Sequence, residues 1–344
     1  MKWNEMKWNE MNLNHTQFIH YNNNYNTMIT ATIMGGLGNQ LFQIFATIAA
    51  ALRNNDTFFF LYNDENMGAP GYPRYTHWTT LLCSLRSYLT PSSDVANKMF
   101  QSLPTWNEIG FHYAPLPTET PKYPKPLRLH GYFQSEKYFA DKYESICDMI
   151  QLTQQQSMIK QMYSNESWSA DYIGSPDKKR ILVSTHFRIG DYVLVSDIHP
   201  IMTIQYYYRA LSRIIASHTD TDTSYTVLIF YEAADKDMVL KQIACLKQLC
   251  ATDVNGPAYG RDIQFHFVRD TIPDWQQMLL MSVCDHNIIA NSTFSWWSAY
   301  FNANPDKVVC YPSVWFGPSV PHNTMDLCPE SWTKVDATTA LVNV

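Results

Sequence analysis

The chain has 344 residues, and at about 150 residues per domain this predicts two domains, each with its own core. Its formal charge of −6, from 25 Lys and Arg against 31 Asp and Glu, gives no overall positive field, so nucleic acid is not an expected partner. Neither a run of about 18 apolar residues nor the apolar core of a signal peptide is visible, so we expect a cytoplasmic protein, with peripheral membrane contact possible.

The predicted elements begin at residue 28. The preceding residues, 1–27, repeat MKWNE and are rich in Asn, which predicts a disordered low-complexity tail. Strands are predicted at 29–34, 57–62, 127–133, 181–187, 225–231, 263–268, 287–290 and 308–311. Helices are predicted at 40–53, 136–150, 204–217, 237–249, 274–283 and 294–302. This alternation predicts an α/β fold with parallel sheets, which bind ligands at the carboxyl ends of their strands.

Two segments interrupt the alternation. Residues 104–126 contain six prolines and predict a long surface loop without regular structure, of the kind that often carries binding. Residues 163–179 are polar and have the composition of a linker. We therefore expect one Rossmann-like domain over 28–165 and a second over 180–344.

A glycine-rich turn, GGLGNQLFQ, follows the first strand and contains Gly36, Gly38 and Asn39. Glycines at a strand-to-helix turn present free backbone N–H groups and a partial positive charge, which suit a phosphate. The alternative is a tight turn without a ligand. Leu41 replaces the third glycine of GxGxxG and no Gly-Lys-Ser/Thr follows, so NAD and P-loop chemistry are disfavoured.

The strand 181–187 runs into the sequence HFRIGD. Alternation puts His186 and Arg188 on one face near the carboxyl end, and Gly190 turns the chain so that Asp191 can fold back. Arg188 offers a planar fork that fits a diphosphate, and Asp191 could orient this guanidinium or the His186 ring. The alternative is an Arg–Asp pair on the surface.

Two further strands end in polar clusters. Glu232 and Asp235 follow the strand 225–231, where carboxylates can accept hydrogen bonds from a ribose or a guanine, although Asp235 could also cap a helix. After the strand 287–290 come Ser292, Thr293 and Ser295, which suit a helix N-cap and a second side of a phosphate. The adjacent Trp296 and Trp297 are interpreted as core. No His/Cys cluster or well-placed DxD predicts a metal site, since Asp220 and Asp222 precede a strand.

In this order, GGLGNQLFQ, HFRIGD, HPIMTIQYYYRA and NIIANSTFSWWSAYF resemble the α-1,2-fucosyltransferases of glycosyltransferase family 11, as does GYFQSEKYF from Gly131. The resemblance covers residues 28–335. It implies the GT-B fold, in which two Rossmann-like domains face each other, the second holding the donor GDP-fucose and the first the acceptor glycan. It also implies inverting transfer of L-fucose from GDP-β-L-fucose to a sugar hydroxyl, such as the 2-OH of a galactoside, with no metal or other cofactor.

The resemblance also implies roles for single residues. It assigns Arg188 to the donor diphosphate, with His186 beside it. It also places Asn39 and the Gly36–Gly38 loop near this diphosphate, on the side of the opposite domain. Ser292, Thr293 and Ser295 contact the diphosphate from another side. The family tends to have paired aspartates where this chain has Ala234-Asp235, which leaves Asp235, with Glu232, for the guanosine. Ile189 stands where a second Arg is often found.

Other functions remain open at this point. They are a fucosyltransferase of another linkage, a non-catalytic glycan-binding relative and a nucleotide-dependent oxidoreductase. The general base is not identified, with Asp191 and His186 as candidates. We expect the acceptor near residues 72–78 and the proline-rich loop, from their position alone.

Overall fold

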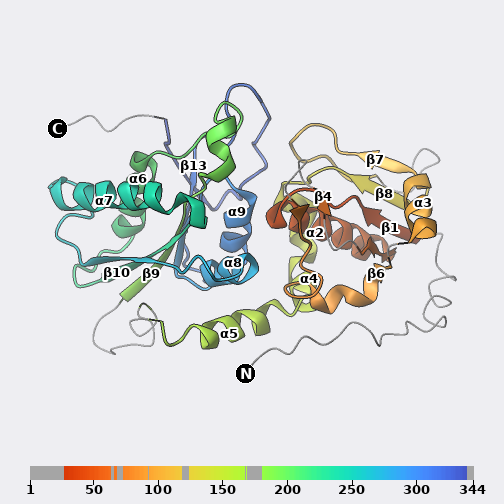
Figure 1. The fold of residues 1–344 in the computed structure, drawn as a ribbon, viewed down its shortest axis with the longest axis horizontal. Helices are drawn as coiled ribbons and strands as arrows, with labels where there is room; N and C mark the ends of the chain where they lie inside the picture. The colour runs from red at the N-terminus through yellow and green to blue at the C-terminus, as the bar shows by residue number, and fades with distance from the viewer. Residues whose placement is uncertain are drawn as a thin grey trace.

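The computed structural model describes residues 27–338 except for 63–65, 68–72, 92, 118–123, 167 and 169–179. The predicted tail, apart from Thr27, and most of the predicted linker lie outside these residues. The proposed domain boundaries at 165 and 180 therefore remain a prediction. The chain forms two halves that lie side by side, each built on a parallel sheet (Figure 1).

The first half contains a four-stranded parallel sheet of order β2-β1-β8-β7. Its strands are β1 (Met28–Ala31), β2 (Thr57–Phe58), β7 (Thr105–Asn107) and β8 (Leu127–His130). Thus β7 lies inside the proline-rich segment, which we had expected to lack regular structure. That expectation was wrong because the three residues after Pro104 contain no proline, so they can pair with β8 at the edge of the sheet.

Smaller elements complete this half. The predicted strand 57–62 splits at Phe59, and its second part pairs in parallel with a later strand, forming a separate two-stranded sheet. The elements are β3 (Phe60–Leu61), β4 (Asn66–Met67), β5 (Pro73–Arg74), η3 (Cys83–Tyr88), β6 (Leu89–Thr90) and α3 (Asp94–Ser102). The sequence did not predict α3, although Ser93 caps it by accepting a hydrogen bond from the Ala96 backbone N–H.

The predicted helix 136–150 is broken into η4 (Glu136–Tyr138), η5 (Ala140–Lys142) and α4 (Tyr143–Met149), and α5 (Leu152–Met162) follows unpredicted. The break falls at Phe139, whose φ of −146° is not helical. Its buried ring stacks on Trp297 with a centroid distance of 5.2 Å. A buried aromatic ring contributes about 3–5 kcal/mol on the scale of Phe→Ala changes, so this packing favours the conformation in which the helix is broken.

The second half is built on a six-stranded parallel sheet of order β11-β10-β9-β12-β13-β14. The strands are β9 (Arg180–His186), β10 (Ser224–Phe230), β11 (Ile263–Phe267), β12 (His286–Ile288), β13 (Val309–Pro312) and the unpredicted β14 (Thr333–Val335). Counted from β9, this is the 3-2-1-4-5-6 order of the Rossmann fold. The order reverses between β9 and β12, so these two strands mark the expected ligand position.

Helices connect these strands as the sequence predicted. They are α6 (Ile204–Ala216), α7 (Lys236–Thr252), α8 (Asp274–Ser282) and α9 (Thr293–Tyr300), with the 3₁₀ turns η6 (Gly190–Val195) and η7 (Ala233–Asp235). In the first half, α2 (Leu37–Asn54) follows β1. Two facing Rossmann-like units with parallel sheets constitute the GT-B architecture, so the predicted fold class is confirmed.

The two halves share one continuous hydrophobic core, with α2 packed against α9 at the boundary (Figure 1). Phe42 and Phe45 of α2 contact Trp296 and Trp297 of α9, with centroid distances of 4.5 Å for Phe42–Trp296 and for Phe45–Trp297. All four rings are fully buried, which confirms that the two tryptophans are core. This interface fixes the position of one helix N-terminus relative to the other.

Among the described helices, none combines the length and the apolar character needed to span a bilayer.

Candidate active site

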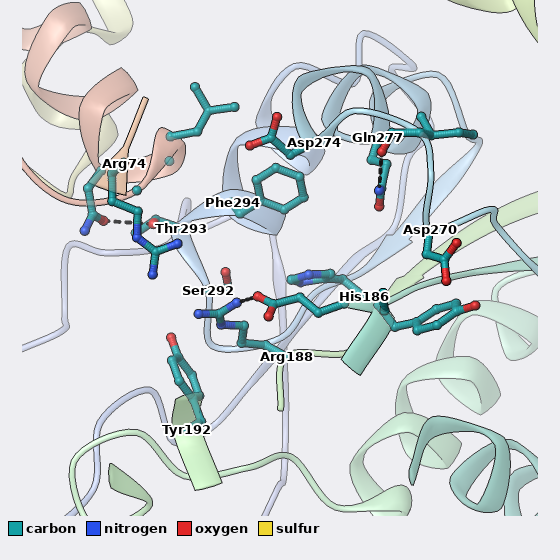
Figure 2. Close-up of a pocket in the computed structure, with 18 residues that line it drawn as sticks. Arg74, His186, Arg188, Tyr192, Asp270, Asp274, Gln277, Ser292, Thr293 and Phe294 are labelled. Atoms are coloured by element: carbon teal, nitrogen blue, oxygen red, sulfur yellow. Dashed lines mark hydrogen bonds and ion pairs between the residues drawn. The ribbon is translucent and has the colours of Figure 1, made fainter. Parts of the chain in front are cut away.

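A cavity of about 460 Å³ lies at the switch point of the six-stranded sheet (Figure 2). Its walls come from the carboxyl ends of β9, β10 and β12 and, across the boundary between the halves, from the N-terminus of α2. Eight residues singled out in the sequence line it: Gly36, Gly38, Asn39, His186, Arg188, Glu232, Ser292 and Thr293. The structure thus gathers most of the predicted site residues around one space.

Two helix N-termini border this cavity. Gly36 and Ser292 occupy the N-cap positions of α2 and α9. In neither helix does the side chain of the N-cap residue accept a hydrogen bond from a backbone N–H, and neither helix has an acidic residue in its first turn. The first backbone N–H groups of both helices are therefore not satisfied by a capping side chain, and the helix dipoles place partial positive charge at both ends. Paired helix N-termini of this kind favour an anion between them.

Gly38 explains how the two helix ends come so close. A Cβ atom at this position would lie 2.3 Å from the backbone carbon of Thr293 and 2.5 Å from the backbone nitrogen of Phe294. Only glycine leaves room for this backbone approach. At Gly36, by contrast, an added Cβ would have no heavy atom within 4 Å. The sequence predicted the same role for the two glycines, but only Gly38 is required for the close approach of the two helices.

Asn39 ties the same helix ends together. Its Oδ1 accepts hydrogen bonds from Thr293 Oγ1 at 2.8 Å and from Gln134 Nε2 at 2.9 Å. The first bond crosses from α2 to α9, so it links the two halves directly at the cavity wall. Because both partners of that bond also line the cavity, Asn39 fixes the orientation of the Thr293 hydroxyl at the site.

Arg188 extends into the cavity from the loop after β9, and its side chain is only 16% exposed. Its Nη2 donates to Asp191 Oδ1 at 2.5 Å, and its other terminal nitrogen pairs with Glu232. The guanidinium also lies 5.0 Å from the centre of the Tyr192 ring. Carboxylates and an aromatic face therefore hold the guanidinium in place. The Arg–Asp pair considered as the alternative is present, and the guanidinium also lines the cavity.

His186 is buried at the end of β9 and lines the cavity beside Arg188. Burial, with the nearby charge of Arg188, lowers the pKa of His186 to about 3. Its ring is therefore neutral at pH 7, and its buried Nδ1 has no hydrogen-bond partner among the described residues. A neutral ring of this kind is a hydrogen-bonding group for a ligand and only a weak base.

Three residues singled out in the sequence do not line the cavity. Asp191 is the ion-pair partner of Arg188. Asp235 is buried and accepts a hydrogen bond from the Gly190 backbone N–H at 2.8 Å, so it fixes the turn that follows Arg188. Its side chain does not cap α7. Ser295 is fully buried and donates to the Ser292 carbonyl oxygen at 3.2 Å. The predictions that Asp235 and Ser295 face the ligand therefore receive no support from this geometry.

Other lining residues were missed in the sequence: Leu37, Arg74, Tyr192, Tyr231, Ala233, Asp270, Ile272, Asp274, Gln277 and Phe294. Most of them follow a strand or begin a helix, and the carboxyl end of β11 was a signal that could have pointed to Asp270. Arg74 lies within residues 72–78, where we expected the acceptor from position alone, but nothing in that segment predicted that its side chain would lie near Arg188. No group of three or more His, Cys, Asp or Glu side chains able to hold a metal ion occurs within the described residues.

The family model Glycosyl transferase family 11 matches residues 4–315, which is nearly the whole chain. This chain belongs to glycosyltransferase family 11. The resemblance found in its motifs is therefore confirmed at the level of the family, and the cavity is the candidate active site of a glycosyltransferase.

Two curated Escherichia coli proteins are similar to this family 11 glycosyltransferase. An alpha-1,2-colitosyltransferase is 23% identical over 328 residues, or 90% of this chain and 99% of that protein. The O-antigen biosynthesis glycosyltransferase WbnK is 30% identical over 157 residues, which span 44% of each chain.

Among solved structures, a mutant of Arabidopsis thaliana FUT1 in complex with GDP aligns with a TM-score of 0.46 and 13% identity, covering 89% of this chain and 76% of that one. A family 9 glycosyl transferase from Veillonella parvula aligns with a TM-score of 0.41 and 11% identity, covering 91% and 86%.

The contact at Gly38 leads to a prediction about stability. Gly38→Ala would force the α2 and α9 backbones apart, and overpacking of this kind costs about 1–3 kcal/mol of unfolding free energy. Gly36→Ala is the matched control, since its added methyl meets open space and its φ of −74° suits alanine. Urea denaturation of the three proteins measures the difference. Equal midpoints for Gly38→Ala and Gly36→Ala would contradict the packing explanation.

Proposed function

We propose that this family 11 glycosyltransferase transfers L-fucose from GDP-β-L-fucose to a sugar hydroxyl, namely the 2-OH of a galactoside, with inversion to an α-1,2-fucoside. Family membership supports a glycosyltransferase, and the E. coli relative named for an alpha-1,2 transfer supports the linkage. The observation that carries the proposal is the convergence of Arg188 and the two uncapped helix N-termini on one cavity.

That convergence fits the chemistry of the transfer. The acceptor hydroxyl attacks the anomeric carbon, the bond to the diphosphate breaks, and the transition state has oxocarbenium character. Negative charge grows on the departing diphosphate, so groups that already point at it lower the barrier. Arg188 supplies a bidentate fork, and the first N–H groups of α2 and α9 supply neutral donors. These groups can perform the role that a divalent ion performs elsewhere, so we propose a reaction without a metal.

The polar character of the cavity suggests an orientation for the nucleotide. Figure 2 shows Asp270 and Gln277 on the side of the pocket away from Arg74. Asp270 is exposed, and a carboxylate there can accept hydrogen bonds from the N1–H and 2-amino groups of a guanine or from a ribose. We propose that the nucleoside lies toward Asp270 and the diphosphate toward Arg188. Glu232, which pairs with Arg188 here, then becomes available to the ribose.

The acceptor proton has two candidate bases. The low pKa of His186 makes its ring a poor proton acceptor at neutral pH. Asp191 is half-exposed, and a donor diphosphate that takes its place beside Arg188 frees its carboxylate, which makes Asp191 the stronger candidate. Because bond breaking to the leaving group leads the reaction, weak assistance from such a base late in the transfer is sufficient.

The colitosyltransferase relative favours one alternative donor. Colitose is L-fucose without its 3-hydroxyl group, so the two GDP-sugars differ by one hydrogen-bonding group. A site that hydrogen-bonds this hydroxyl strongly rejects the deoxy sugar, whereas a site that leaves it in solvent accepts both. Turnover of the two donors measured in competition therefore decides between a fucosyl and a colitosyl donor.

The donor class is tested by thermal-shift measurements with GDP-fucose, GDP, UDP, ADP and NAD, each with and without EDTA. A ligand that binds only the folded state raises the melting temperature, by an amount that grows with its concentration relative to its Kd. We expect shifts for the two guanine nucleotides alone, unchanged by EDTA, and release of GDP from GDP-fucose when a galactoside is added. A comparable shift with UDP, or loss of the shift in EDTA, contradicts the proposal, and a shift with NAD alone favours an oxidoreductase.

Arg188 is tested by the variants Arg188→Ala and Arg188→Lys. Removing one prearranged donor to a developing charge typically lowers kcat by about 10²- to 10³-fold. Lysine keeps the charge but loses the bidentate fork, so we expect both variants to fall by this amount while the melting temperature stays close to that of the wild type. The control is Arg213→Lys at an exposed position of α6. Near-normal turnover of Arg188→Lys would contradict the role of Arg188 at the diphosphate.

A further inference from the structure

The cavity contains a second cationic side chain, Arg74, which comes from the first half of the chain. Among the described residues that line the cavity, Arg74 and Arg188 are the two that carry a positive charge. Arg74 lies in β5, more than a hundred residues before Arg188 in the sequence. Figure 2 shows the two side chains extending toward each other beside Ser292.

One carboxylate lies between the two guanidinium groups. Asp191 Oδ1 is 2.5 Å from Arg188 Nη2, and Asp191 Oδ2 is 3.8 Å from Arg74 Nη2. Like charges in one cavity repel each other, and an anion that contacts both lowers this repulsion. Asp191 is the anion that contacts both arginines, and a phosphate group, which is also an oxyanion, can take its place.

The two ion pairs differ in strength. The Arg188 side chain is 16% exposed and pairs with two carboxylates, whereas the Arg74 side chain is 40% exposed and its contact with Asp191 is long. An exposed pair of this kind contributes little free energy, so Arg74 can exchange Asp191 for a ligand at small cost.

The backbone next to Arg74 is nevertheless held firmly. The Tyr75 carbonyl oxygen accepts a hydrogen bond from Gln40 Nε2 of α2 at 3.2 Å. His77 Nε2 lies 3.3 Å from Asp274 Oδ1, at the start of α8. Because α2 and α8 both border the cavity, these contacts keep the Arg74 side chain within reach of it.

We propose that Arg74 contacts the diphosphate of the donor and supplies a second cation to the leaving group, opposite Arg188. This inference rests on the proposed function, because it takes a nucleoside diphosphate sugar as the ligand. A diphosphate carries charge on both phosphates, and a clamp with one guanidinium from each half neutralises it from two sides. It also makes donor binding depend on both halves of the chain.

The test compares GDP with guanosine, which lacks both phosphates. Calorimetry measures GDP affinity and ligand-observed NMR measures guanosine affinity, for the wild type, Arg74→Ala, Arg74→Lys and the exposed control Arg213→Ala. Loss of a hydrogen-bonded charge contact reduces affinity by about 10- to 100-fold. We expect Arg74→Ala to lose this much affinity for GDP and none for guanosine, Arg74→Lys to recover part of it, and Arg213→Ala to bind both ligands as the wild type does.

Three other results have distinct meanings. If Arg74→Ala binds GDP as tightly as the wild type, the inference is overturned while the proposed function stands. If affinity for guanosine falls in parallel with that for GDP, Arg74 only supports the shape of the pocket, and the inference is again overturned. If the wild type binds no GDP, the proposed function itself fails.

Discussion

The contact between the N-terminus of α2 and the N-terminus of α9 determines the rest of the site. It brings together two helix ends whose dipoles both point their positive ends at one cavity, and this is unfavourable without a nearby anion. Asp191 and Glu232 pair with Arg188 and so offset its charge, not the partial charge of the helix ends. The cavity therefore favours an anionic ligand, and the diphosphate of a nucleotide sugar is such a ligand.

The aromatic interface between the halves keeps this arrangement in place. Phe42 and Phe45 of α2 contact Trp296 and Trp297 of α9, inside a core that extends through both halves. Buried aromatic pairs contribute about 0.5–1.5 kcal/mol each beyond their burial. Their combined effect makes the relative position of α2 and α9 a property of the core, so the site is held ready before the ligand arrives.

The helices of the second half, most of its strands and eight of the eighteen residues that line the cavity were predictable, because each follows from a local pattern. The β-rich run ending at His186 and the glycine turn after β1 both mark carboxyl ends of parallel strands, and these ends meet at the switch point. The role of Asp235 was not predictable in this way, because a carboxylate after a strand can face either the ligand or a backbone N–H group. Its actual partner, the Gly190 N–H, lies 45 residues earlier.

Other features depend on contacts that no local pattern records. The packing of Gly38 on Thr293 joins residues 255 positions apart, and a glycine in a turn gives no sign of which backbone it will meet. The same holds for Arg74, since neither its neighbours in the sequence nor its short strand indicate that it faces Arg188. The break at Phe139 likewise depends on Trp297, which lies in the other half.

The most direct measurement is a crystal structure of the protein with GDP bound. The account predicts the diphosphate between Arg188 and the first turns of α2 and α9, with Glu232 no longer paired to the guanidinium. Density for GDP elsewhere, or a diphosphate out of contact with Arg188 and both helix ends, would contradict it.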